Sequence, residues 1–142
     1  MDRAALDVAI KLGLKYGGFC PKGRLAEDGI ISEKYNLIEN NSPQYAKRTL
    51  ENVKIADGSL IIHTGIVSGG TRETIDYCNI HNKPFIEINP LEKLQQTQVN
   101  FDHWKKDNQI TLLNVAGPRE SEGQVYDKTV SLLNILFCQF KI

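Results

Sequence analysis

The stretch SLIIHTGIVSGGTRETIDYC, residues 59–78, decides the fold of this chain. Its first six residues contain a short apolar, β-branched run, which predicts a short strand covered on both sides. From about residue 71 to residue 81 the pattern changes to helical spacing, with Thr74, Ile75 and Cys78 facing inward. A glycine-rich connection joins the two parts. Residues 59–81 therefore predict a strand–loop–helix unit of an α/β fold.

The same alternation continues on both sides of this unit. Helices are predicted over residues 2–12, from Ser42-Pro43 onward, over 91–106 and at the end of the chain, and strands over 14–21, 83–89 and 109–117. Gly13 is the predicted C-cap of the first helix, and the polar residues 22–41 predict a long loop. The side chains expected to be buried are Ala5, Val8, Ala9 and Leu12 in the first helix, Ala46, Thr49, Leu50 and Val53 in the second, and Tyr126, Val130, Leu133, Leu136, Phe137 and Phe140 in the last. Residues 1–142 thus predict a single Rossmann-like domain, a parallel sheet with helices on both faces.

The start of the chain departs from this pattern, because it opens on a helix with no strand before it. A doubly wound domain normally begins with a central strand whose loop leads into the first helix. We therefore expect a Rossmann-like sheet that lacks the usual first strand.

The composition of the chain argues against several classes of function. Lysine plus arginine and aspartate plus glutamate number 17 each, so no net positive charge marks a nucleic-acid surface. The three cysteines are odd in number and far apart, and together with the three histidines they show no metal-ligand spacing. No signal peptide or membrane-spanning stretch is evident. We expect a cytoplasmic protein with no structural metal, no nucleic acid and no membrane partner.

Three segments are expected to meet at the carboxyl ends of the strands, where parallel sheets bind ligands: 20–24, 68–74 and 116–121. Gly69 and Gly70 would let backbone N–H groups approach a phosphate or another oxyanion at a helix N-terminus. The hydroxyl and cationic groups that could assist are Thr71, Arg72, Thr74, Arg119 and Ser121, with Gly117 in the second loop and Lys22 and Arg24 at the side.

Each of these signals also has a plain structural interpretation. The Gly-Gly loop could be a tight turn with a helix cap, and Arg119 could be solvated or paired with Glu120. Cys20 at a strand end is interpreted as a packed small side chain, because no neighbouring histidine would activate it. His63, inside an apolar strand, is interpreted as a core histidine with satisfied nitrogens.

Read together, the segments DRAALDVA, GGFCPKGRLAEDG, YAKRTLENV, DGSLIIHTG, SGGTRET and LLNVAGPRES resemble the molybdenum-cofactor carrier family. This is a Rossmann-like group related to the lysine-decarboxylase-like (LOG/SLOG) nucleotide-binding proteins. The resemblance implies a cytosolic homo-oligomer, a dimer or tetramer, that binds molybdenum cofactor, protects it and serves molybdoenzymes. The ligand-facing residues that it implies are Gly69, Gly70, Thr71, Gly117, Pro118, Arg119, Glu120 and Ser121, with Cys20, Pro21 and Lys22 nearby.

The chain differs from this family at its front, where members usually carry a strand and a GGQTG-type loop before the DRAALD helix. Two other functions use the same loops. Some relatives hydrolyse nucleoside monophosphates at a PGGxGTxxE loop, in which Thr74 occupies the position of the glutamate and Glu73 lies one residue early. A nucleotide-sensing module without catalysis is the other alternative. We expect no catalytic residue and a small anionic ligand, either molybdenum cofactor or a nucleotide.

Overall fold

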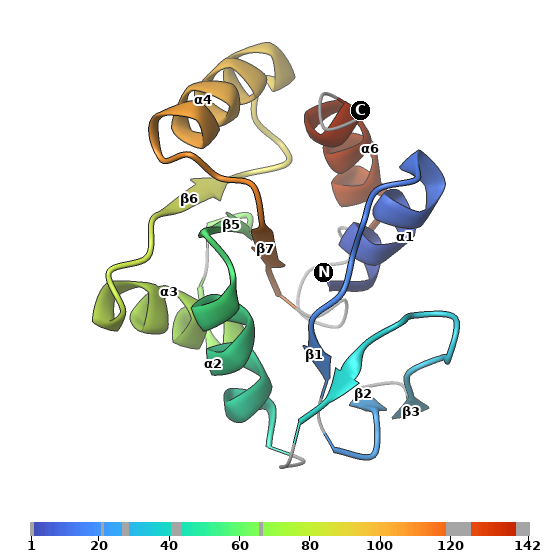
Figure 1. Cartoon of the computed structure of the whole chain (residues 1–142). Helices are drawn as coiled ribbons and strands as arrows, with labels where there is room; N and C mark the ends of the chain where they lie inside the picture. Colours follow the sequence, from blue (N-terminus) through green and yellow to red (C-terminus); the bar gives the residue numbers. More distant parts are fainter. Residues whose placement is uncertain are drawn as a thin grey trace.

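The centre of the molecule is a parallel sheet of three strands. The structure, a computed structural model, describes residues 2–20, 22–26, 29–40, 44–65, 67–118 and 126–138. The strands are β5 (Gly58–Ile62), β6 (Phe85–Ile88) and β7 (Leu113–Ala116), and they lie in the order β6-β5-β7 (Figure 1). Both neighbours of β5 run parallel to it, as the alternation of strands and helices predicts.

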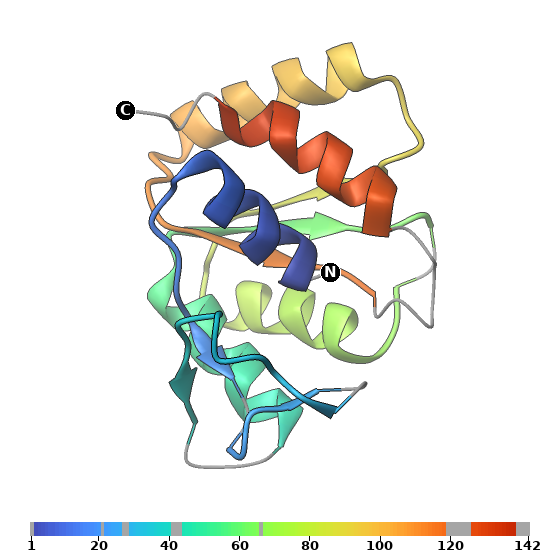
Figure 2. The same cartoon turned by 90° about the vertical axis from the view of Figure 1, so that its right-hand side faces the viewer.

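Helices cover both faces of this sheet (Figure 2). On one face lie α1 (Asp2–Leu12), α4 (Leu94–Asp107) and α6 (Tyr126–Phe137), and on the other lie α2 (Tyr45–Ile55) and α3 (Gly69–Ile80). The predicted α/β architecture with a parallel sheet and helices on both faces is therefore confirmed.

The strand β5 separates two apolar clusters because its side chains alternate between the faces. Leu60 and Ile62 point into the larger cluster, which α1, α4 and α6 complete with residues such as Val8, Phe101 and Leu133. Ile61 points the other way, against Ile75 of α3 and Ala116 of β7. All five residues of β5 are buried, as the apolar run predicts.

Residues 14–40 differ from the prediction. The strand expected over 14–21 is reduced to β1 (Phe19–Cys20), which pairs in parallel with β4 (Ile38–Glu39). The stretch predicted as a loop also contains β2 (Leu25–Ala26) and β3 (Gly29–Ile30), which pair antiparallel. Each of these strands pairs with its partner over only two residues.

The helix limits agree with the prediction to within three residues where both can be compared. The α3 helix begins at Gly69, two residues before the predicted start, and α4 begins at Leu94. Gly13 caps α1 as predicted: the N–H of Gly13 donates to Ile10 O and that of Leu14 to Ala9 O, the bonds of a Schellman motif. Ser42, Pro43 and Phe140 lie outside the described residues. Within those residues, no helix is long and apolar enough to cross a membrane.

Candidate anion-binding site

The predicted site lies at one edge of the sheet. The carboxyl ends of β5 and β7 reach the same side of the molecule, and α1, α3 and α6 begin there (Figure 2). The first N–H groups of a helix have no partner within the helix, and its dipole favours negative charge at this end. This edge is therefore suited to an anion.

The first turn of α3 is open to solvent. Its N-cap, Ser68, has an extended backbone with φ −148° and ψ 173°, and its side chain makes no capping hydrogen bond. Gly69 has a φ of +53°, and a Cβ placed on Gly69 or Gly70 would meet no atom within 4 Å. Among the described residues, no side chain therefore blocks the approach of an anion to the backbone of Gly69 and Gly70.

Thr71 in this turn and Thr74 in the next turn face the interior. Thr71 is 4% exposed and Thr74 is 2% exposed. The Thr74 hydroxyl donates to the carbonyl of Gly70 at 2.9 Å, so it is engaged by its own helix. Arg72 is exposed, and its Nε lies 3.3 Å from the carboxylate of Asp76 one turn later.

The second loop is described only at its start. Gly117 and Pro118 directly follow β7 and are half-buried. Arg119, Glu120 and Ser121, which the sequence places in the same loop, lie outside the described residues.

The third segment, residues 20–24, is carried by a separate part of the fold. Cys20 lies buried in β1, which pairs with β4 and not with the described strands of the main sheet. Burial raises the pKa of the Cys20 thiol, while the nearby charges of Arg24 and Arg48 oppose this effect. The geometry therefore agrees with a packed side chain and not with a nucleophile. Lys22 is exposed, and Pro21 is outside the described residues.

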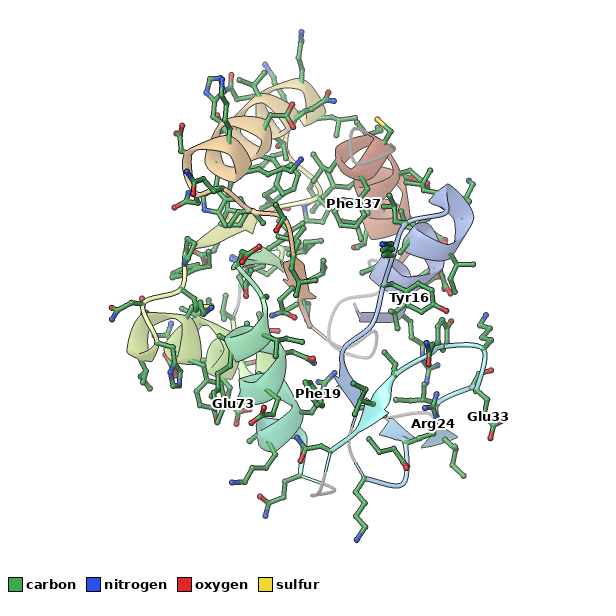
Figure 3. The ribbon with its side chains drawn as sticks, in the orientation of Figure 1. Tyr16, Phe19, Arg24, Glu33, Glu73 and Phe137 are labelled. Carbon is green, nitrogen blue, oxygen red and sulfur yellow. The ribbon has the colours of Figure 1, made fainter. Side chains whose placement is uncertain are left out.

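The Arg24 side chain stabilises a turn of the backbone. Its guanidinium donates to the carbonyls of Ile31, Ser32 and Tyr35 at 2.8–3.2 Å, and these bonds hold the turn that follows β3. Figure 3 shows Arg24 at the end of the molecule that carries β2 and β3.

The position of His63 at the edge of the sheet was not predicted from the sequence. It follows the last residue of β5, and its side chain is only 16% exposed. Its Nε2 lies 3.0 Å from Oε1 of Glu87 in β6, and its Nδ1 accepts the N–H of Gly65 at 3.1 Å. Both nitrogens are satisfied, as predicted, but at the sheet edge and not within the strand. The one signal in the sequence was Glu87, a charged residue inside the apolar stretch KPFIEIN.

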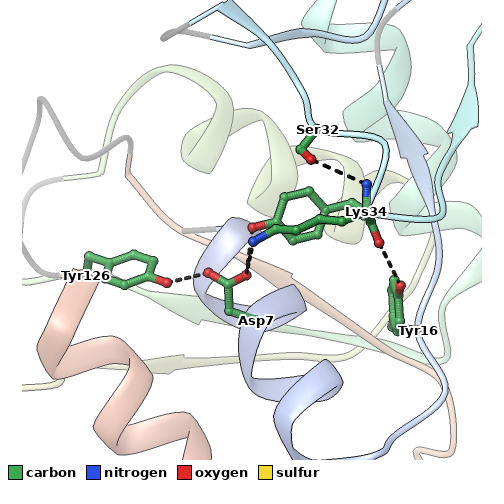
Figure 4. Close-up of polar contacts among 6 residues, drawn as sticks. Asp7, Tyr16, Ser32, Lys34 and Tyr126 are labelled. Carbon is green, nitrogen blue, oxygen red and sulfur yellow. Dashed lines mark hydrogen bonds and ion pairs between the residues drawn. The ribbon is translucent and has the colours of Figure 1, made fainter.

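A second polar cluster joins α1, α6 and the turn after β3 (Figure 4). The carboxylate of Asp7 accepts the hydroxyls of Tyr35, at 2.6 Å, and of Tyr126, and Nζ of Lys34 lies 3.9 Å from it. The hydrogen bond to Asp7 raises the pKa of Tyr126 to about 12, with a further contribution from burial. Beside this cluster is an open pocket of about 420 Å³, lined by Asp7, Ile10, Gly13, Leu14, Tyr16 and Lys34.

No metal-binding group of three or more histidine, cysteine, aspartate or glutamate side chains occurs among the described residues. The described part of the site therefore offers backbone N–H groups and single side chains as its means of holding a ligand.

These features define a class of protein: a Rossmann-like α/β protein in which an open helix N-terminus lies at the carboxyl edge of the parallel sheet. The model of the circularly permutated YpsA SLOG family matches residues 1–137, and the chain belongs to this family.

One solved structure gives a closer comparison. The chain is 40% identical to a putative molybdenum carrier protein from Syntrophus aciditrophicus SB, with a TM-score of 0.91. The match covers 95% of this chain and 87% of the other. A comparison with curated proteins finds no match. The resemblance drawn from the sequence motifs is confirmed by the family and the structure together.

Proposed function

We propose that this protein binds molybdenum cofactor as cargo and carries it in the cytoplasm without transforming it. The similarity to the putative molybdenum carrier protein supports this proposal. The observation that carries it is the open first turn of α3, where Gly69 and Gly70 present backbone at the carboxyl end of β5. Molybdenum cofactor ends in a phosphate, which suits a helix N-terminus of this kind.

In this proposal the backbone does most of the binding. The N–H groups of Gly69, Gly70 and Thr71 hold the phosphate, and the missing Cβ atoms allow it to approach closely. The buried Thr71 and Thr74 side chains support the turn from below. The second loop supplies Gly117, Pro118, Arg119, Glu120 and Ser121 as further ligand contacts, as the sequence motif suggests.

The segment 20–24 has a lesser part in this proposal. Lys22 is exposed and is assigned only a long-range attraction for the anionic ligand, and buried Cys20 is assigned only a packing role. We further propose that the protein acts as a homo-oligomer, a dimer or tetramer, and releases its cargo to molybdoenzymes.

The structure favours this proposal over nucleotide hydrolysis at one position. A hydrolase of the related type needs a glutamate where this chain has Thr74, and Thr74 is buried with its hydroxyl bonded to Gly70. Glu73 is the neighbouring residue, and on a helix one residue turns the side chain by about 100°. The same loops could also bind a nucleotide for sensing, so AMP is the matched test ligand.

The test is retention of ligand on a sizing column. Purified protein is mixed with molybdenum cofactor or with AMP, and the protein fraction is assayed for bound pterin and for released adenine. Pterin that elutes with the protein, with no adenine, is the expected result. Release of adenine from AMP would instead make the protein a hydrolase, and retention of intact AMP without pterin would favour the sensor.

Two arginines allow a sharper prediction. Arg119→Ala should weaken ligand binding about tenfold or more, because charge-assisted hydrogen bonds to phosphate contribute about 1.5–3 kcal/mol. Arg72→Ala should have a smaller effect, because Arg72 is exposed and already paired with Asp76. Both affinities are measured by titration calorimetry. Equal losses for the two variants, or no loss for either, would contradict the assignment of Arg119 to the site.

A further inference from the structure

His63 links three parts of the chain at the edge of the sheet. Its backbone N–H donates to the carbonyl of Ile88 at 3.1 Å, which continues the pairing of β5 with β6. Its imidazole contacts Glu87 of β6 through Nε2 and the N–H of Gly65 through Nδ1. A single side chain therefore connects β5, β6 and the first residues of the connection to α3.

The contact with Gly65 selects one tautomer of the neutral ring. A backbone N–H can only donate, so Nδ1 of His63 must carry a lone pair. In the neutral imidazole the proton then lies on Nε2, where it is donated to the carboxylate of Glu87 at 3.0 Å. Glu87 favours this tautomer, and the tautomer makes the bond to Gly65 possible.

The same contact shapes the backbone after the strand. A side-chain acceptor that binds the N–H two residues later is the arrangement of an Asx turn, here formed by a histidine. Gly65 has a φ of +129°, a conformation that residues with an L side chain rarely adopt. The turn sets the direction in which the chain leaves β5 on its way to Ser68 and α3.

We propose that His63 is a positioning residue that holds the connection between β5 and α3, with Glu87 selecting the tautomer that allows it to do so. The consequence for ligand binding rests on the proposed function, because this connection leads into the turn assigned to the phosphate. The turn itself can be tested without any ligand.

The proposal predicts a response to acid. A protonated imidazole has N–H groups on both nitrogens, so its Nδ1 cannot accept the Gly65 N–H. Among the described residues, the charged group in contact with the ring is Glu87 of β6. The strand β7, on the other side of β5, carries no titratable side chain. The charged residues in the first turns of α3 are Arg72 and Glu73, and Arg72 pairs with Asp76. Protonation of His63 would therefore release the turn while its pairing with Glu87 persists.

The first experiment is nitrogen NMR on the full chain, without ligand, with labelled histidine and glycine. In the neutral ring we expect Nδ1 of His63 to be unprotonated and Nε2 to be protonated, with the Gly65 amide shifted by its hydrogen bond. The Gly65 signal should move as His63 is protonated. A ring with its proton on Nδ1, or a Gly65 amide unaffected by His63→Leu, would overturn the proposal.

The second experiment compares variants by titration calorimetry with AMP and by retention of molybdenum cofactor. His63→Leu removes both contacts and should weaken binding about fivefold, the value of one hydrogen bond of ordinary strength. His63→Asn should bind nearly as well as the wild type, because its Oδ1 can accept the Gly65 N–H in a true Asx turn. His103→Leu, a change at an exposed position of α4, is the matched control and should have no effect.

The pH profile separates positioning from simple packing. Binding by the wild type should weaken on acidification more than binding by His63→Asn, because asparagine takes up no proton while the ligand phosphate titrates equally in both. Equal pH profiles, or a loss in His63→Asn as large as in His63→Leu, would refute the positioning role. If the wild type binds neither probe, the proposed function fails, and the NMR experiment still decides the role of His63.

Discussion

At the scale of single residues, the attachment of β1 depends on a pair of neighbours, Gly18 and Asn52. The Asn52 side chain of α2 accepts the N–H of Phe19 at 2.8 Å and donates to its carbonyl at 3.2 Å. Gly18, directly before Phe19, has a φ of +126°, and a Cβ there would lie 3.0 Å from Asn52 Oδ1. The short strand β1 thus needs a glycine directly before its first residue and the side-chain amide of Asn52 next to its backbone.

Gly18→Ala should lower the free energy of unfolding by about 1–3 kcal/mol, since it forces an L side chain into a strained conformation beside Asn52. Gly17→Ala is the matched control: a Cβ on Gly17 would meet nothing within 4 Å. We expect this control to change stability by less than about 0.5 kcal/mol. Urea denaturation measures both. Similar losses in the two variants would show that the positive φ is not the cause.

At the scale of elements, Asp57 joins the start of β5 to the residues that lead into β7. Its Oδ2 accepts the N–H groups of Thr111 and Leu112 and the Thr111 hydroxyl at 2.8–3.0 Å. These hydrogen bonds, chiefly that from Leu112, lower the pKa of Asp57 below its ordinary value of 3.8. The carboxylate therefore stabilises the folded state at pH values above 3.8, and this contribution is lost as the pH falls through the lowered pKa.

Asp57→Asn should reduce the free energy of unfolding by about 1 kcal/mol at neutral pH, because a charged acceptor is replaced by a neutral one. The difference from the wild type should shrink as the pH falls below about 3.8, where the carboxyl of the unfolded chain takes up a proton, and should be lost as the pH falls through the lowered pKa of the folded state. Chemical denaturation at several pH values tests this, with Glu33→Gln, a change at an exposed residue, as control. A difference that is independent of pH would exclude the carboxylate as the cause.

Element by element, the sequence was most informative where the determinants are local. The apolar run of β5 and the Gly13 cap depend on neighbouring residues, and both were predicted. The β1 strand was predicted too long, because its extent depends on β4 and on Asn52, 33 residues away from Phe19. The His63–Glu87 pair was missed for a similar reason, since strand register, and not spacing, brings the two together.

At the scale of the whole molecule, Asp7 holds distant segments together. It binds the hydroxyls of Tyr126 at the start of α6 and of Tyr35 after β3. Nζ of Lys34 lies 4.8 Å from the centre of the Tyr35 ring. Because the folded-state pKa of Tyr126 is about 12, against an ordinary value of 10.0, its neutral hydroxyl stabilises the fold below pH 10. That contribution is lost as the pH rises toward 12.

Tyr126→Phe should lower the free energy of unfolding by about 1–2 kcal/mol at neutral pH, because it removes a hydrogen bond to a charged group. The difference from the wild type should decline between pH 10 and about 12. Tyrosinate absorbance and alkaline unfolding measure the two effects, and Tyr77→Phe in α3, on the other face of the sheet, is the control. If the highest-titrating tyrosine remains in Tyr126→Phe, the assignment is wrong.

The packing of α1 against α6 also has a consequence for synthesis of the chain. Val8 and the leucines of α6 belong to one cluster, and Asp7 meets Tyr126 across 119 residues of sequence. During translation α1 leaves the ribosome well before the helix that covers it exists. The apolar face of α1 stays uncovered until α6 has been synthesised, so folding is completed late. In the nascent protein, α1 is therefore a segment that a chaperone would shield.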